Sequence, residues 1–125
     1  MKRFVVEAWL LLLYFELAVR FHAFQAIRSI VQQQQTRPTT TAGSIASETL
    51  SRAMDFACVF YFKRVQCLQR SAATTLLLRR HGWNAEMVTG VQIIPYNAHA
   101  WVEIHDEVVN DKPYMREIYQ VLERY

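Results

Sequence analysis

The period of the hydrophobic residues changes near Gly82, and this change limits the folds open to the chain. Before Gly82 the apolar residues recur every three or four positions, as on one face of an α-helix. After Gly82 they alternate with other residues, most clearly in the stretch NAHAWVEI at residues 97–104. A period of two is typical of a β-strand. The sequence therefore predicts an α+β fold, with helices first and a small antiparallel sheet after them.

Two amphipathic helices are predicted between the centre of the chain and Gly82. The first covers residues 47–62, with Ser47 as its candidate N-cap. Its helical spacing predicts a buried face of Leu50, Met54, Ala57 and Tyr61. The second begins at Cys67 and ends in a basic turn, which suits the negative end of the helix dipole. Gly82 then follows as a natural C′ residue.

Short strands are predicted for the rest of the chain, at residues 85–94, 98–104 and 108–110. Gly90 marks a bulge or a turn within the first of them. Residues 111–118 are expected to form a loop with one helical turn. The last segment, residues 119–125, fits either a strand or a short helix, and the sequence leaves this choice open.

The first 31 residues predict an apolar helical region, as two helices joined near residues 19–22 or as one long bent helix. Glu7 and Glu16 interrupt the hydrophobic run, whose longest unbroken piece is residues 8–15. A membrane-spanning helix needs roughly 18–20 apolar residues, so membrane contact is not expected. These helices fit either a part of the core or a docking surface for a partner protein.

Residues 32–46, QQQQTRPTTTAGSIA, are low in complexity and contain Pro38 and Gly43. Such a composition is typical of a linker or a loop. The chain is therefore divided into a helical region at 1–31, a linker at 32–46 and a domain of helices and strands at 47–125. The whole length of 125 residues is that of one small domain.

Charge and cysteine content narrow the function classes. The net charge is only +3, and no basic run is present, so a nucleic-acid partner is not expected. Cys58 and Cys67 would lie on different sides of a helix, which argues against a disulfide, and neither has zinc-site spacing. Two reduced thiols indicate a cytoplasmic protein without a structural metal.

Three side chains capable of catalysis fall at the ends of predicted elements. Cys67 begins a helix, whose positive end stabilises a thiolate. His99 begins a strand, and Asp111 directly follows the next strand. A cysteine, a histidine and an acid in this order are the arrangement of papain-like and transglutaminase-like cysteine enzymes. We expect Cys67 to be the nucleophile, His99 the base and Asp111 its orienting acid, with Asp106 as the rival acid.

The residues around these three positions resemble the B2 proteins of lasso peptide biosynthesis, which are transglutaminase-like leader peptidases. The resemblance covers roughly residues 50–125, and the spacing of the three residues agrees with that family. It rests on a C-L-x-R-S start, an Arg/His–Gly helix end, a Gly-Val pair, the motif A-H-A-W-V-E and a final V-V-N-D. Its matching positions are Cys67, Leu68, Arg70, Ser71, Gly82, Gly90, Val91, Ala98, His99, Ala100, Trp101, Val102, Glu103 and Asp111.

This resemblance implies a cysteine peptidase that cuts the leader from a ribosomally made lasso precursor. It implies that a separate B1-type protein presents the leader, and that an ATP-using cyclase joins the freed amine to an acidic side chain. It also implies a pocket for a threonine two residues before the cleaved bond. No cofactor and no metal are implied. The oxyanion would be held by backbone N–H groups at the helix start, with Cys67 as the first donor and a second near Gln66.

Two other functions remain open at this point. A transglutaminase-like acyl transferase would use the same three residues but pass the acyl group to an amine instead of water. A non-catalytic peptide-binding module would keep the fold without the reaction. A product mass would distinguish the first, and an unreactive Cys67 would favour the second.

The remaining residues of interest have structural interpretations. Cys58 is expected in the core, and His81 is expected to serve the end of its helix. Arg70 and Ser71 fit a solvated helix face and a small packing residue. Trp101 shares a strand face with His99, and it fits a wall of the active site as well as a cover for the sheet.

Overall fold

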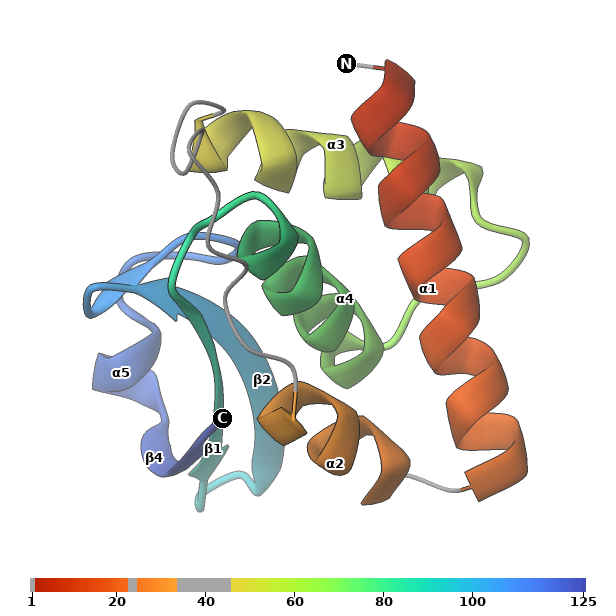
Figure 1. The fold of residues 1–125 in the computed structure, drawn as a ribbon. Coiled ribbons are helices and arrows are strands. Elements are labelled where there is room, and N and C mark those ends of the chain that lie inside the picture. The colour runs from red at the N-terminus through yellow and green to blue at the C-terminus, as the bar shows by residue number, and fades with distance from the viewer. Residues whose placement is uncertain (1, 23–24, 34–45) are drawn as a thin grey trace.

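A computed structural model describes residues 2–22, 25–33 and 46–125 (Figure 1). The predicted α+β fold is confirmed, because all the long helices precede the sheet. The sheet is antiparallel, with the strand order β3-β2-β1-β4. The elements are α1 (Lys2–His22), α2 (Gln25–Gln33), α3 (Ser47–Phe60), α4 (Cys67–Arg80), β1 (Ala85–Gln92), β2 (Asn97–Ile104), β3 (Glu107–Val108), α5 (Met115–Ile118) and β4 (Gln120–Arg124).

The N-terminal region forms two helices, which is one of the two arrangements expected from the sequence. α1 ends at His22, which is the last residue of the junction expected at 19–22. α2 reaches Gln33, and it therefore takes up the first two residues of the predicted linker. The rest of that linker up to residue 45 lies outside the described residues, so the division into regions stays a prediction.

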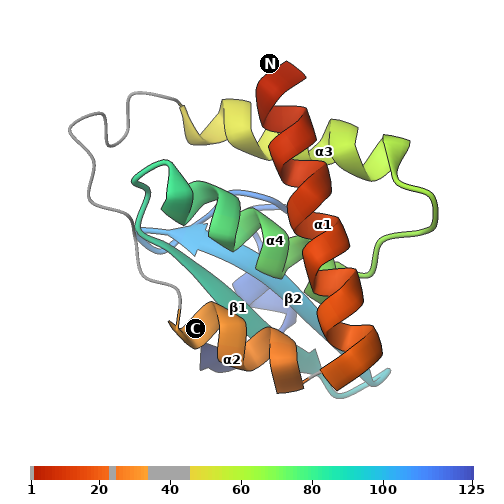
Figure 2. The same cartoon turned by 45° about the vertical axis from the view of Figure 1, so that its right-hand side comes forward.

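α1 has one buried face and one exposed apolar face. Ala8, Leu12 and Phe15 are fully buried, at the spacing of a helix stripe. This face packs against α3 and α4, which α1 crosses in Figures 1 and 2. The opposite face exposes Val6, Leu10, Tyr14, Leu17 and Phe21. One side of α1 thus belongs to the core.

Membrane spans were sought among the described residues, and none of their helices combines the length and the hydropathy that crossing a bilayer requires.

The helix ends correct two details of the sequence prediction. α3 starts at Ser47, but Ala46 is its N-cap, and no side chain caps it. The carbonyl of Ala46 instead accepts the N–H groups of Thr49 and Leu50. α3 also ends at Phe60 and not at residue 62, because Tyr61 adopts an extended conformation.

The sheet separates two hydrophobic clusters. On one face Met87, Val102 and their neighbours pack with α4 and the other helices. On the other face Val88 and Trp101 pack with Met115 of α5, which lies on the far side of the sheet from α4 (Figure 1). Residues 100–104 of β2 are therefore all buried, although their alternation predicts one polar face.

The strand predicted at residues 108–110 forms only as Glu107–Val108. It pairs with the end of β2 and stops there, so the segment that follows is free to turn toward α4. The last segment of the chain resolves as the strand β4, which pairs with β1. The register of that pair shifts between Thr89 and Gly90, at the position where a bulge was predicted.

Candidate active site

The open edge of β2 faces the start of α4. Because β3 pairs only with the end of β2, Ala100 has no strand neighbour on this side. Its carbonyl accepts a hydrogen bond from Ser71 Oγ at 3.0 Å, and its N–H donates to the sulfur of Cys67. The backbone of β2 is thus fixed directly to the first turn of α4.

The segment after β3 occupies the edge of β2 where a further strand would pair, and it contacts β2 through one side chain and one backbone group. Asn110 Oδ1 accepts the N–H of Val102 at 2.7 Å, and the N–H of Val109 donates to the Val102 carbonyl at 2.9 Å. Asn110 Nδ2 also donates to Ser71 Oγ at 3.3 Å. Asn110 therefore joins α4 and β2 immediately before Asp111.

These contacts bring the three predicted residues together. His99 Nε2 lies 2.6 Å from Asp111 Oδ2, and the side chain of Cys67 is hydrogen-bonded to His99. Since Nε2 faces Asp111, Nδ1 is the nitrogen left for the sulfur. Both ring nitrogens are engaged, and the side chains of His99 and Asp111 are 24% and 27% exposed. The rival Asp106 lies in the β2–β3 turn at a φ of 65°.

The electrostatics of the pair favour charge separation. The hydrogen bond with His99 lowers the pKa of the Cys67 thiol below 9.0 although burial opposes it, and the N–H groups of Ala100 and Leu68 add to this effect. The hydrogen bond with Cys67 raises the pKa of His99 to about 9 against burial, with a further contribution from Asp111. Both shifts favour the ion pair of a Cys67 thiolate and a His99 imidazolium.

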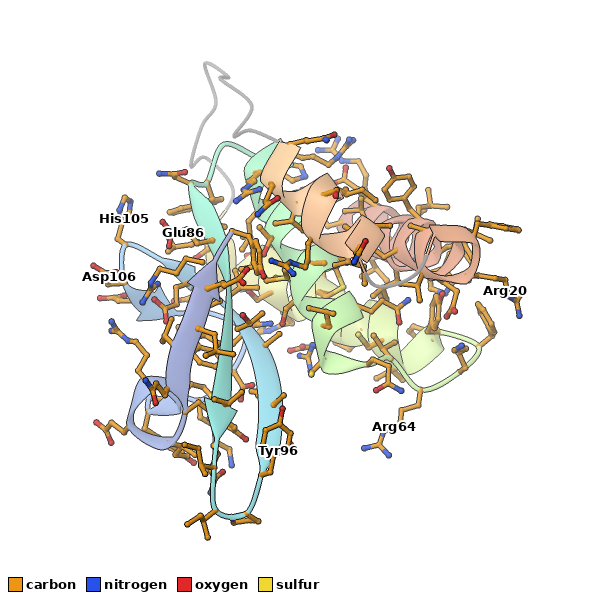
Figure 3. All side chains as sticks on the ribbon, turned by 90° about the horizontal axis from the view of Figure 1, so that it is seen from below. Arg20, Arg64, Glu86, Tyr96, His105 and Asp106 are labelled. Carbon is orange, nitrogen blue, oxygen red and sulfur yellow. The ribbon has the colours of Figure 1, made fainter. Side chains whose placement is uncertain are left out.

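A cavity of about 500 Å³ opens over this pair. Arg64, Gln66 and Arg70 line it from the side of α4, and Asn97 lines it from β2. Arg64 projects from the segment before α4, on the same side of the molecule as Tyr96 of the β1–β2 turn (Figure 3). Across the described ranges, no group of three or more His, Cys, Asp or Glu side chains could hold a metal ion.

Two aromatic rings lie beside His99. The ring of Trp101 is centred 6.1 Å from the imidazole and that of Tyr119 is centred 5.4 Å from it, and both are stacked. Asn97 Nδ2 donates to the Tyr119 hydroxyl at 3.0 Å. Strand alternation predicts that Trp101 shares a face with His99. Tyr119 and Asn110 were missed, because only the tertiary structure brings them to the site.

Several neighbouring residues differ from their expected roles. Cys58 is only half-buried and packs against the core, and burial raises the pKa of its thiol. Arg70 lines the cavity and pairs with Asp55, so it does more than occupy a solvated face. Ser71 is a buried packing residue as predicted, but its hydroxyl also fixes β2.

The position of His81 agrees with the sequence analysis. His81 is the C-cap of α4, and its Nε2 lies 2.7 Å from Glu7 Oε1, a partner on α1 that was not foreseen. His105 occupies the β2–β3 turn with a φ of 51°. The side chain of His22 lies outside the described part of the chain.

Comparison with known proteins places the chain in a family. The sequence model of the transglutaminase-like superfamily matches residues 9–124. The microcin J25-processing protein McjB of Escherichia coli is 38% identical over 56 residues, which are 45% of this chain and 27% of McjB. No solved structure matches the chain significantly. The similarity to McjB supports the resemblance to the lasso peptide B proteins, and the superfamily match covers nearly the whole sequence. The chain belongs to the transglutaminase-like superfamily.

Proposed function

We propose that this protein is a cysteine endopeptidase that removes the leader from a lasso peptide precursor. The observation that carries the proposal is the chain of contacts from Cys67 through His99 to Asp111 at the start of a helix. A thiolate beside an imidazolium is the ground state that peptide-bond attack by cysteine requires. The similarity to a microcin J25-processing protein supports the choice of substrate.

In the first half of the reaction the Cys67 thiolate attacks the scissile carbonyl carbon. The thiol proton already resides on His99, which then gives it to the leaving amine as the C–N bond breaks. The leader remains on Cys67 as a thioester. In the second half, neutral His99 takes a proton from water, the hydroxide attacks the thioester, and the thiolate leaves. Asp111 keeps Nδ1 of His99 directed at the sulfur throughout.

The start of α4 supplies the charge stabilisation. Among the described residues no side chain caps this helix, and of its first N–H groups that of Leu68 faces the Cys67 sulfur. We assign the backbone N–H of Cys67 as the first oxyanion donor. The side chain of Gln66 lines the same cavity and is the candidate for the second.

The proposal includes partners and a compartment. A B1-type protein would present the leader, and the lasso cyclase would receive the freed core peptide. Both follow from the resemblance to the B2 proteins. Reduced Cys58 and Cys67 fit a cytoplasmic reaction.

Cleavage of a candidate precursor, followed by mass spectrometry, tests this function. The precursor is taken from a short reading frame beside this gene, and the reactions are run with and without the leader-binding partner. We expect leader release that requires Cys67 and becomes much faster with the partner. Cys58→Ala is the matched control, because it removes the thiol that lies away from His99. A product heavier by an added amine would support acyl transfer instead, and intact precursor bound to folded protein would support the binding module.

A further inference from the structure

Glu103 is a buried charge for which the proposed reaction has no use. It lies on β2, on the strand face of His99 and Trp101, and is 1% exposed. Its oxygens accept hydrogen bonds from Trp101 Nε1 and from Arg124, both at 2.8 Å. Arg116 Nε of α5 lies at 3.7 Å. A buried carboxylate is strongly unfavourable unless it is paired in this way.

The partners keep Glu103 ionised. Burial raises the pKa of its carboxyl, but the hydrogen bonds from Arg124 and Trp101, together with the charge of Arg116, lower the pKa below its usual value. Arg124 belongs to the last strand and Arg116 to α5, so Glu103 joins both C-terminal elements to β2. Its third partner is the indole beside the proposed catalytic histidine.

The indole of Trp101 is fixed on its other sides as well. The residue is fully buried. A Cβ at Gly90 would stand 2.9 Å from Trp101 Cη2 and 2.9 Å from the carbonyl oxygen of Gln120, so only glycine leaves room for the ring. The ring of Tyr119 is centred 6.0 Å away. Together with the hydrogen bond from its N–H to Glu103, these contacts fix the orientation of the indole.

The imidazole of His99 needs such support. Its two nitrogens serve Asp111 and Cys67 at once, so a rotation of the ring about its long axis breaks both contacts. The stacked rings of Trp101 and Tyr119 restrict this rotation. Aromatic faces also attract a cation, and they therefore favour the protonated imidazole.

We propose that Glu103 is a positioning residue for His99. With Arg124 it fixes the indole of Trp101, and the indole holds the imidazole in the orientation that joins Cys67 to Asp111. The catalytic meaning of this device rests on the proposed function. The device itself is visible in the reactivity of the Cys67 thiol, which needs no peptide substrate.

The test measures the rate of Cys67 alkylation by iodoacetamide as a function of pH, in a Cys58→Ala background that leaves one thiol. Glu103→Gln keeps an acceptor for the indole but removes the charge opposite Arg124. Glu103→Leu removes both. Glu86→Gln is the matched control, because it removes the exposed carboxylate 3.5 Å from the same Arg124 (Figure 3).

For Glu103→Leu we expect the pH midpoint of Cys67 alkylation to move toward that of an ordinary thiol by about one pH unit. At acidic pH this shift corresponds to an alkylation rate about tenfold lower. Glu103→Gln should move it less, and Glu86→Gln should leave it unchanged. The groups that face His99 are Cys67 of α4, Asp111 after β3 and Tyr119 before β4, and none of them is altered.

A purely structural role for Glu103 would lower the melting temperature of Glu103→Gln but leave its alkylation midpoint at the parent value. That result overturns the inference. If Glu103→Leu does not fold, Glu103→Gln decides alone. The proposed function fails separately, when the parent protein shows an acidic alkylation midpoint yet cleaves no precursor.

Discussion

The two ends of α4 are built in opposite ways. At the C-terminal end the N–H of Gly82 donates to the carbonyl of Arg79 at 3.2 Å, and that of Trp83 donates to Leu78 at 3.0 Å. Gly82 has a φ of 88°, so the end is a complete Schellman motif. The N-terminal end has no side-chain cap, and Cys67 is its first residue.

In the proposed function, one end of this helix contributes to the stability of the fold and the other end to the reaction. The carbonyls at the C-terminal end are satisfied by the chain itself, which stabilises the fold. The N–H groups at the N-terminal end are left for the Cys67 sulfur and, in the proposed reaction, for the oxyanion. Changes at the C-terminal end should therefore alter mainly the free energy of unfolding, and changes at the N-terminal end should alter mainly the rate of precursor cleavage.

The largest effect is expected when the reacting groups are removed. Cys67→Ala and His99→Ala should each abolish precursor cleavage, because nucleophile and proton carrier act as one unit. The unfolding midpoint should stay close to that of the wild type, since Cys67 is exposed and the side chain of His99 is partly exposed. Cleavage assays and thermal unfolding check both statements. Residual cleavage by Cys67→Ala near the wild-type rate would exclude the thiolate.

The pH profile should be bell-shaped. The thiolate is lost as the pH falls through the lowered pKa of Cys67, and the imidazolium is lost as the pH rises through about 9, the raised pKa of His99. Because Cys67 and His99 titrate together, the acidic and alkaline limbs of the profile both report on the pair and not on either residue alone. Asp111→Asn removes one of the groups that raise the pKa of His99, so the alkaline limb should move to lower pH with partial activity left. An unmoved limb would show that Asp111 does not act on His99.

A new cap at the N-terminal end of α4 should raise the stability of the protein and lower its proposed activity. Gln66→Asp provides a carboxylate that caps α4, which should stabilise the protein by about 1 kcal/mol. It should also occupy the free N–H groups and place a negative charge beside the thiolate, lowering the cleavage rate on the order of 10²-fold. Gln66→Ala separates the two causes, since it loses the candidate oxyanion amide without adding a cap, and Gln66→Asp should cleave more slowly than Gln66→Ala does. A capped variant with wild-type activity would contradict the role given to this helix end.

The smallest effect on activity is expected at the other end. Gly82→Ala forces a side chain into the left-handed region, which should destabilise the fold by about 1–2 kcal/mol. The rate of cleavage per folded molecule should not change. Chemical denaturation and titration of active protein measure the two quantities. A loss of turnover in fully folded Gly82→Ala protein would mean that the two ends of α4 are coupled.

The positions of the proposed catalytic residues were predictable because each lies at an element end that local patterns define. Cys67 follows a polar break, His99 opens a strand with a clear period of two, and Asp111 comes after an apolar pair. The fold class followed from the change of period at Gly82 for the same reason.

The supporting residues were not predictable, since their roles depend on contacts between distant segments. Asn110 reads as part of a strand, yet its side chain replaces a strand at the edge of β2. Glu103 reads as the polar face of a strand, and only the arrival of Arg124 and Arg116 makes its burial possible. Tyr119 lies directly before β4, and it stacks on His99 because β4 pairs with β1 in the sheet order β3-β2-β1-β4. This strand order cannot be predicted from local sequence patterns.

In the proposed reaction Cys67 forms a covalent intermediate with the leader. The most direct measurement is the intact mass of the protein after a short reaction with precursor and leader-binding partner, quenched in acid. We expect an adduct equal to the leader less one water, located on Cys67 and absent from Cys67→Ala. Leader release at the wild-type rate by Cys67→Ala, with no adduct on either protein, would contradict it.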